Sequence, residues 1–127
     1  MANWQKVASE AKKAVKKVDN AIGHLDKEIN AAVDAAIADG KVSKKERARI
    51  DALTKQSNEL VNTRTRILDA AIEALDRGAD VTRMRQKMIG IRKRLENRQK
   101  ELKQTEQAAN AVGQALSTIA GILTFLI

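Results

Sequence analysis

The chain has 127 residues with no proline, no cysteine and no tyrosine, and only one phenylalanine and one tryptophan. The lack of cysteine excludes disulfides, thiolate metal sites and thiol nucleophiles. The scarcity of aromatic side chains argues against an all-β fold, because strands favour aromatic and β-branched residues. One histidine is too few for most imidazole metal sites and general-base triads. We therefore expect no enzyme, no metal, no cofactor and no small-molecule substrate.

Positive charge and aliphatic side chains dominate what is present. Lysine and arginine number 24 against 16 acidic residues, which gives a net charge of +8, and 43% of the chain is hydrophobic. The positive excess favours anionic partners such as nucleic acid or anionic lipid, without choosing between them. No apolar stretch follows the start of the chain, so we expect no cleavable secretory signal.

Apolar residues recur three and four positions apart along most of the chain, which predicts an all-α protein. Breaks at Gly40 and Gly78 divide this pattern, because glycine commonly follows the end of a helix. Ser43 and Glu46 form a capping-box pattern, and Asp80 is a suitable N-cap. These signals predict helices at about 4–38, 43–77 and 80–126.

The segment Asp39–Glu46 resembles the second half of an EF-hand calcium loop. That match would place Ala35 and Ile37 at the first two ligand positions, where neither side chain can bind calcium. We therefore interpret the segment as a corner between two helices.

The distribution of charge predicts antiparallel neighbours. Residues 6–17 carry five lysines and one glutamate, whereas 18–39 are mainly acidic. The second predicted helix starts basic and ends acidic, and the third starts basic again. Turns at Gly40 and Gly78 would place opposite charges beside each other, which favours this pairing.

The third predicted helix is the longest. Its apolar register runs from Val81 to Leu126 with only Arg98 and Thr105 as polar interruptions, and one helix of this length would span roughly 70 Å. The first two helices could cover it only to about residue 115. The sequence thus predicts an elongated three-helix antiparallel array with a long, protruding C-terminal helix, divided into a charged region 1–106 and an uncharged apolar extension 107–127.

The extension supplies the main candidate site. It carries no charge from Gln107 onward, and as a helix it would match the roughly 30 Å hydrocarbon core of a bilayer. The predicted membrane or assembly surface consists of Val112, Leu116, Ile119, Ile122, Leu123, Phe125 and Leu126. A stripe of small residues, of the kind that lets membrane helices approach closely, consists of Ala109, Gly113, Ser117 and Gly121.

Three arrangements of the extension are open: contact with a membrane, burial against other subunits, or a fold-back at a glycine. We rank them in that order. The prediction is a non-enzymatic homo-oligomer that assembles through its C-terminal helix and is membrane-active, by insertion or pore formation. The alternative is a soluble coiled-coil subunit of a larger assembly, such as a phage, secretion or filament component.

A second candidate site lies at the start of the third helix. Its basic residues are Arg83, Arg85, Lys87, Arg92, Lys93 and Arg94. They occupy several faces and have no aromatic residue among them for base stacking. We therefore expect these basic residues to form ion pairs with carboxylates of the second helix, and nucleic acid is a weaker candidate for their partner.

Overall fold

The computed structural model describes residues 3–76, 80–102 and 105–126. These residues form four α-helices and no strand, which confirms the all-α prediction. The helices are α1 Trp4–Asp39, α2 Lys44–Leu75, α3 Val81–Glu101 and α4 Glu106–Phe125.

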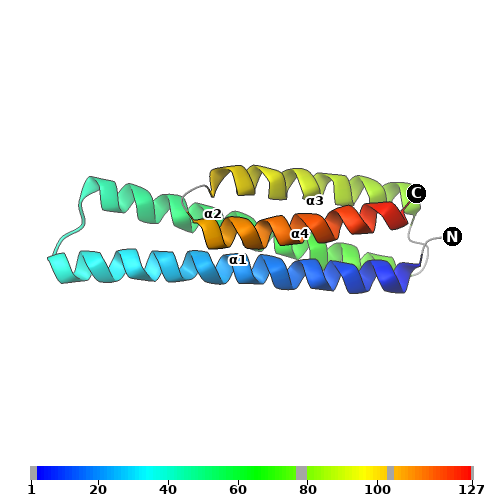
Figure 1. Cartoon of the computed structure of the whole chain (residues 1–127), viewed down its shortest axis with the longest axis horizontal. Helices are drawn as coiled ribbons and strands as arrows, with labels where there is room; N and C mark the ends of the chain where they lie inside the picture. Colours follow the sequence, from blue (N-terminus) through cyan, green and yellow to red (C-terminus); the bar gives the residue numbers. More distant parts are fainter. Residues whose placement is uncertain (1–2, 77–79, 103–104, 127) are drawn as a thin grey trace.

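The helices form an antiparallel bundle in which each packs on its neighbours in chain order (Figure 1). Helix α1 packs on α2 and α4, and α3 packs on α2 and α4, whereas neither diagonal pair is in contact within the described chain. A single core of buried aliphatic residues joins all four helices. The largest fully buried side chains include Leu25, Leu60, Met88 and Ile119.

The corner between α1 and α2 is built as the sequence predicts. Gly40 adopts the left-handed conformation with a φ of 74°, and its N–H donates to the carbonyl of Ile37 at 3.1 Å. The Ser43 hydroxyl accepts from the backbone N–H of Glu46 at 3.1 Å, and the Glu46 carboxylate accepts from that of Ser43 at 3.2 Å. This reciprocal pair is the predicted capping box, and it starts α2.

The start of α3 also agrees with the sequence. The Asp80 carboxylate accepts from the backbone N–H of Thr82 at 2.9 Å, so Asp80 is the predicted N-cap. Gly78, where we predicted the turn, lies outside the described residues. On either side of this connection, Arg83 of α3 lies 3.3 Å from Glu73 of α2, as the charge pattern predicts.

Ion pairs also join α1 to α2. Arg49 lies 3.1 Å from Glu28, and Arg64 lies 2.7 Å from Asp19. The Arg49–Glu28 pair places the acidic part of α1 beside the basic start of α2, and both pairs agree with the predicted antiparallel orientation. Their side chains are between about one third and one half exposed, so they specify the pairing more than they stabilise it.

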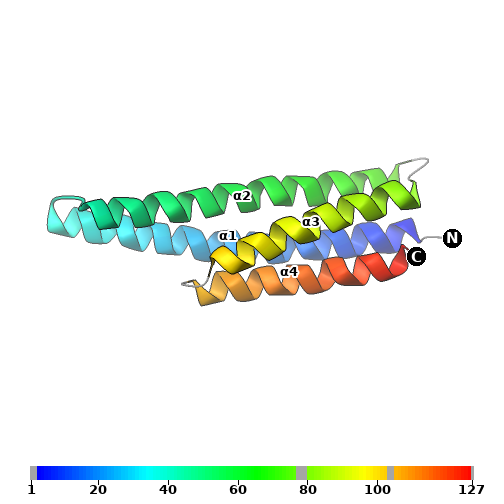
Figure 2. The same cartoon turned by 90° about the horizontal axis from the view of Figure 1, so that it is seen from above.

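The prediction of one continuous third helix is wrong. Helix α3 ends at Glu101, and α4 begins at Glu106 and runs back along α3 and α1 (Figure 2). The physical reason is burial within the same chain: Leu102, at the end of α3, and Ile119 and Ile122, on α4, are almost completely inaccessible to solvent. Full burial of a large aliphatic side chain contributes roughly 1.5–3 kcal/mol, whereas a break in the helix removes only a few backbone hydrogen bonds.

The prediction of a protruding C-terminal helix is also wrong, because the part that protrudes is the hairpin of α1 and α2. Figures 1 and 2 show this hairpin continuing beyond the connection between α3 and α4. Among residues 26–52, which include the corner of this hairpin, Ala36 is the only buried side chain. The fold-back, which we ranked last, is therefore the arrangement that the chain adopts, and the break falls near Thr105 rather than at a glycine.

Candidate functional site

The predicted assembly surface of the C-terminal segment lies largely inside the bundle. Val112, Ile119, Ile122 and Leu126 are at most 1% exposed. The remaining members are partly buried and pack against the core: Leu116, Leu123 and Phe125. The prediction that these residues form one exposed apolar stripe is wrong in this state, because α1 and α3 cover them.

The outward face of α4 is polar but uncharged. Asn110, Gln114, Ser117 and Thr124 are exposed there, and the charge of Glu106 lies in the first turn. Helix α4 is therefore amphipathic without a charged face. Among the described residues it is the one helix long and apolar enough to cross a membrane, although the core helix of a soluble protein can meet the same criteria. Of the residues in its apolar 18-residue stretch, 33% are buried in the bundle.

The small-residue stripe does not form the main contact between α4 and its neighbours. Ser117 is exposed, and Ala109 and Gly121 are only partly buried. Gly113 is the exception, because a Cβ atom there would lie 2.8 Å from the Gln99 amide nitrogen of α3. The small residues that are buried on α4 are the neighbouring alanines Ala108, Ala111 and Ala115.

The basic residues of α3 do not form a single anion-binding face. Arg83 and Lys87 both pair with Glu73 of α2, and Arg92 lies 3.5 Å from Glu96. Arg85, Lys93 and Arg94 are exposed, and no carboxylate in the described chain lies within ion-pair distance of them. Half of the predicted set thus has a carboxylate partner, with three cations sharing two carboxylates, which weakens the nucleic-acid prediction further.

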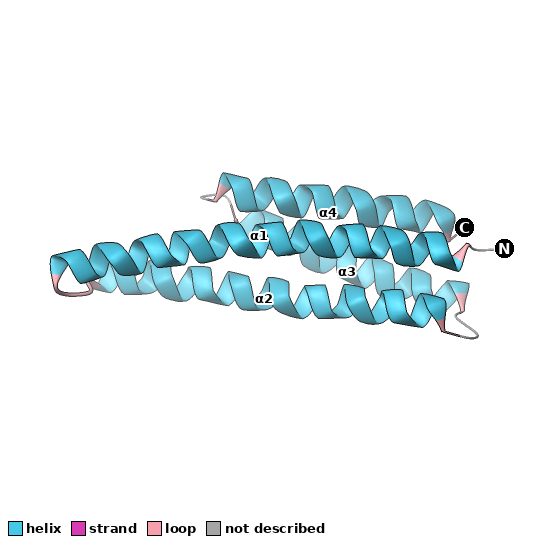
Figure 3. Cartoon of the chain, turned by 90° about the horizontal axis from the view of Figure 1, so that it is seen from below, coloured by secondary structure: helices cyan, strands magenta, loops and turns pink. Residues whose placement is uncertain are grey.

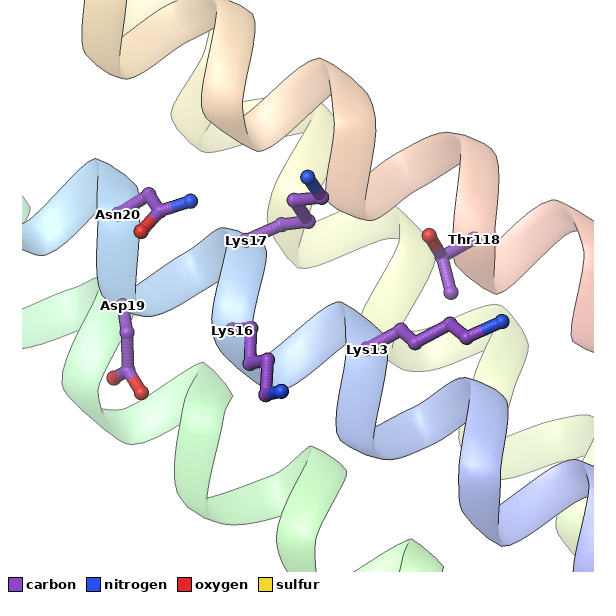
Figure 4. A pocket seen from close by; sticks show the side chains of 6 residues that line it. All are labelled: Lys13, Lys16, Lys17, Asp19, Asn20 and Thr118. Atoms are coloured by element: carbon purple, nitrogen blue, oxygen red, sulfur yellow. The ribbon is translucent and has the colours of Figure 1, made fainter.

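A basic hollow between α1 and α4 is the polar site that the sequence analysis missed. Its volume is about 500 Å³, and it is lined by Lys13, Lys16, Lys17, Asp19, Asn20 and Thr118. Figure 4 shows Lys13 and Lys17 extending toward α4, which carries Thr118, and Asp19 pointing toward α2. The excess of lysine in residues 6–17 was the one sequence feature that pointed to this hollow. It does not locate a hollow until α4 is known to pack beside this part of α1.

A second, neutral hollow adjoins the basic one along the same pair of helices. It has a volume of about 260 Å³ and shares Asn20 with the basic hollow. His24 of α1 and the amides Gln107, Asn110 and Gln114 of α4 line it. Toward the other end of this face, the ammonium of Lys6 lies 4.3 Å from the centre of the Phe125 ring. The face that joins α1 to α4 therefore combines positive charge with uncharged polar groups.

In the part of the chain that the structure describes, no group of three or more histidine, cysteine or acidic side chains has metal-binding geometry. No known protein family, curated protein or solved structure matches the chain.

Proposed function

We propose that this chain is a non-enzymatic, membrane-active helical protein whose membrane-inserting element is α4, and that the bundle is its water-soluble form. The observation that carries the proposal is the character of α4. It is a 20-residue helix with no charge after Glu106, so it would span roughly 30 Å. Its apolar side chains are held inside the bundle, where a protein stable in water must keep them.

The way α4 packs supports its release. It contacts α1 and α3 but not α2, so the contacts of α2 with α1 and α3 do not depend on it. The buried residues of α1 and α4 include many alanines, among them Ala11, Ala14, Ala111 and Ala115. Burying alanine removes less apolar area from water than burying leucine, which lowers the cost of separating these helices.

The polar face of α4 supports self-assembly after insertion. In a single spanning helix, Asn110 and Gln114 would face lipid without hydrogen-bond partners, at a large cost. Several copies of α4 could turn these amides toward one another or toward a wet lumen. We therefore propose that the inserted form is a homo-oligomer, whereas in the closed bundle the apolar face of α4 is not available for assembly.

Dye release from vesicles containing phosphatidylglycerol tests the proposal. Gln114→Lys with Ser117→Lys places two charges near the middle of α4, at positions that are exposed in the bundle, so the closed fold should persist. At the centre of a bilayer each lysine costs about 2.5–3.5 kcal/mol. We expect dye release to fall by about tenfold or more, while attraction to the anionic vesicles is kept or increased.

The matched control is Asn58→Lys with Asn62→Lys, which adds the same charge at exposed positions of α2. This variant should release dye as the parent does. The proposal is wrong if the parent protein releases no dye, or if lysines at 114 and 117 leave release unchanged in a variant that keeps its helical content.

A second candidate function is a soluble structural subunit, favoured by a different observation. Large apolar side chains are exposed at two places on the α1–α2 hairpin: Val33, Ile37 and Val42 near its tip, and Leu68, Ile72 and Leu75 at the far end of α2. Ile37 and Ile72 are 72% and 67% exposed. Clusters of this kind commonly mark contacts between subunits, so assembly through the hairpin rather than through α4 is the form of this alternative that the fold favours.

A further inference from the structure

We propose that the tip of the α1–α2 hairpin docks on the surface of an anionic lipid bilayer. The tip consists of the corner at residues 40–43 and the adjoining helical turns, from residue 33 of α1 to residue 47 of α2. The proposal builds on the membrane function proposed above. It adds a second membrane-binding element, which lies away from α4 and acts while the bundle is closed.

Large apolar side chains gather at the tip and are open to solvent. Ile37 is 72% exposed, and Val42 is 51% exposed. Together with Val33 and Ile50 they line a hollow of about 330 Å³, whose lining also includes Lys41. These side chains therefore share one surface, and an exposed apolar cluster of this kind commonly marks contact with another surface.

Lysines adjoin this apolar cluster. Lys41 precedes Val42, and Lys44 and Lys45 begin α2 directly after the corner. All three lysines are exposed, and no carboxylate of the described chain lies within ion-pair distance of them. Residues 37–47 carry four basic and two acidic side chains, and one of the acids, Glu46, is engaged in the capping box. The tip is thus positive overall, and cations in the first turn of a helix are also opposed by the helix dipole.

The shape of the molecule allows the tip to meet a planar surface. The α1–α2 hairpin continues beyond the connection between α3 and α4 (Figures 1 and 2), so the tip is one end of an elongated molecule and neither α3 nor α4 extends to it. Aliphatic side chains beside lysines suit the boundary between headgroups and acyl chains. The apolar groups enter this boundary, while the ammonium groups stay with the lipid phosphates.

A second copy of the chain fits the tip less well than a bilayer does. Two tips in contact would bring two positive surfaces together, which is unfavourable. Three exposed aliphatic side chains also cannot by themselves supply the roughly 1,200 Å² that a stable protein interface buries. An anionic bilayer provides the complementary charge and needs no large matching surface.

Flotation of the full chain with vesicles of phosphatidylcholine and phosphatidylglycerol, at increasing lipid concentration, tests the apolar contact. Ile37→Ser with Val42→Ser should weaken binding by about tenfold or more, because both side chains leave water on docking. The matched control is Ile72→Ser with Leu75→Ser, which makes the same kind of change at exposed positions near the far end of α2. Its binding should change by less than about twofold, since these residues do not meet the bilayer in this orientation.

The same assay tests the charged contact. Lys41→Gln with Lys44→Gln should weaken binding by about tenfold or more, because each basic residue close to an anionic surface contributes a factor of roughly five. Lys12→Gln with Lys16→Gln removes the same charge from exposed positions of α1 that are remote from the tip. The loss there should be about twofold or less, because the surface potential decays within a Debye length.

A fluorescent label at Val42→Cys separates docking of the tip from insertion of α4. On vesicles we expect quenching by lipids with a nitroxide at the headgroup, both in the otherwise unchanged chain and together with Gln114→Lys and Ser117→Lys, which should prevent insertion of α4. Docking of the tip without dye release would keep this inference and reject α4 as the inserting element. Dye release that the tip variants do not alter, with the label at position 42 still exposed, would do the reverse.

Three results would overturn the inference: a label at position 42 that stays accessible to iodide on vesicle-bound protein, tip variants that bind vesicles as their controls do, or a parent protein that does not bind anionic vesicles. Protection of the label that increases with protein concentration in the absence of lipid, together with a doubled mass in light scattering, would also overturn it. That result would assign the tip to a contact between two copies of the chain.

Discussion

Two glycines illustrate how the conformation of single residues determines where α1 ends. Gly40 has a φ of 74° at the corner between α1 and α2, whereas Gly23 lies within α1 with ordinary helical geometry. Apart from adjoining residues and the backbone of its own helix, a Cβ atom at either position would have no atom within 4 Å. Substitution at these positions therefore tests backbone conformation without a steric clash.

We expect Gly40→Ala and Gly23→Ala to have opposite effects on the free energy of unfolding. Alanine at position 40 must adopt a left-handed conformation, which costs about 1–2 kcal/mol. Alanine at position 23 should stabilise the protein by about 0.5–1 kcal/mol, because glycine in a helix loses more backbone entropy on folding. Urea denaturation measures both, and equal effects of the two substitutions would contradict the assignment of Gly40 as the corner.

Arg98 and Thr105 show how far residue patterns could predict the break in the third helix. We interpreted them as polar interruptions within a continuous seam. In the structure Arg98 lies in the last turn of α3, where its guanidinium donates to Gln56 of α2 at 3.2 Å and to Glu101 at 3.0 Å. Thr105 is the N-cap residue of α4, and Glu106 follows in the first turn. A cation suits the C-terminal end of one helix and an acid the N-terminal end of the next, so these residues did indicate a break. The unbroken apolar register favoured one continuous helix more strongly.

At the scale of elements, the helix ends with clear capping residues were the most predictable. The ends at Gly40, Ser43 and Asp80 follow from local chemistry and agree with the structure. The α3–α4 connection could not be predicted in this way, because Thr105 makes no side-chain capping hydrogen bond and neither glycine nor proline occurs near it. The register of α4 fits burial against other helices equally well in an extended or a folded-back chain, so tertiary packing decides between them.

The exposed residues of the α1–α2 hairpin give a prediction about assembly. If the hairpin joins subunits, Ile72→Ser with Leu75→Ser should lower the particle mass in light scattering, with little loss of stability because both side chains are more than 60% exposed. Ile37→Ser with Val42→Ser makes an equivalent change at the tip and serves as the comparison. A monomeric parent at high concentration, or an unchanged mass in both variants, would exclude the hairpin as an assembly surface.

For the whole molecule, exposed charge and the apolar membrane candidate lie on different hairpins. The long hairpin of α1 and α2 carries most of the exposed charge and projects beyond the bundle, whereas the short hairpin of α3 and α4 lies along its other half (Figure 3). The sequence predicted a projecting apolar segment because an unbroken third helix would be longer than either of the first two helices. Once α4 folds back, the same apolar residues complete the core, and only a change of state can bring them to lipid.

The central claim, that α4 leaves the bundle to enter a bilayer, is tested most directly by the depth of a fluorescent label on this helix. Because the chain has no cysteine, Ala120→Cys provides a single attachment site at a position of α4 that is exposed in the bundle. Asn58→Cys provides the matched site on α2.

On addition of vesicles containing phosphatidylglycerol, we predict that the label at position 120 shifts its emission to the blue. It should be quenched by lipids with a nitroxide deep in the acyl chain and become protected from aqueous iodide, while the label at position 58 stays accessible to iodide. If the label at position 120 stays equally accessible to iodide on vesicle-bound protein, α4 does not enter the membrane and the account is contradicted.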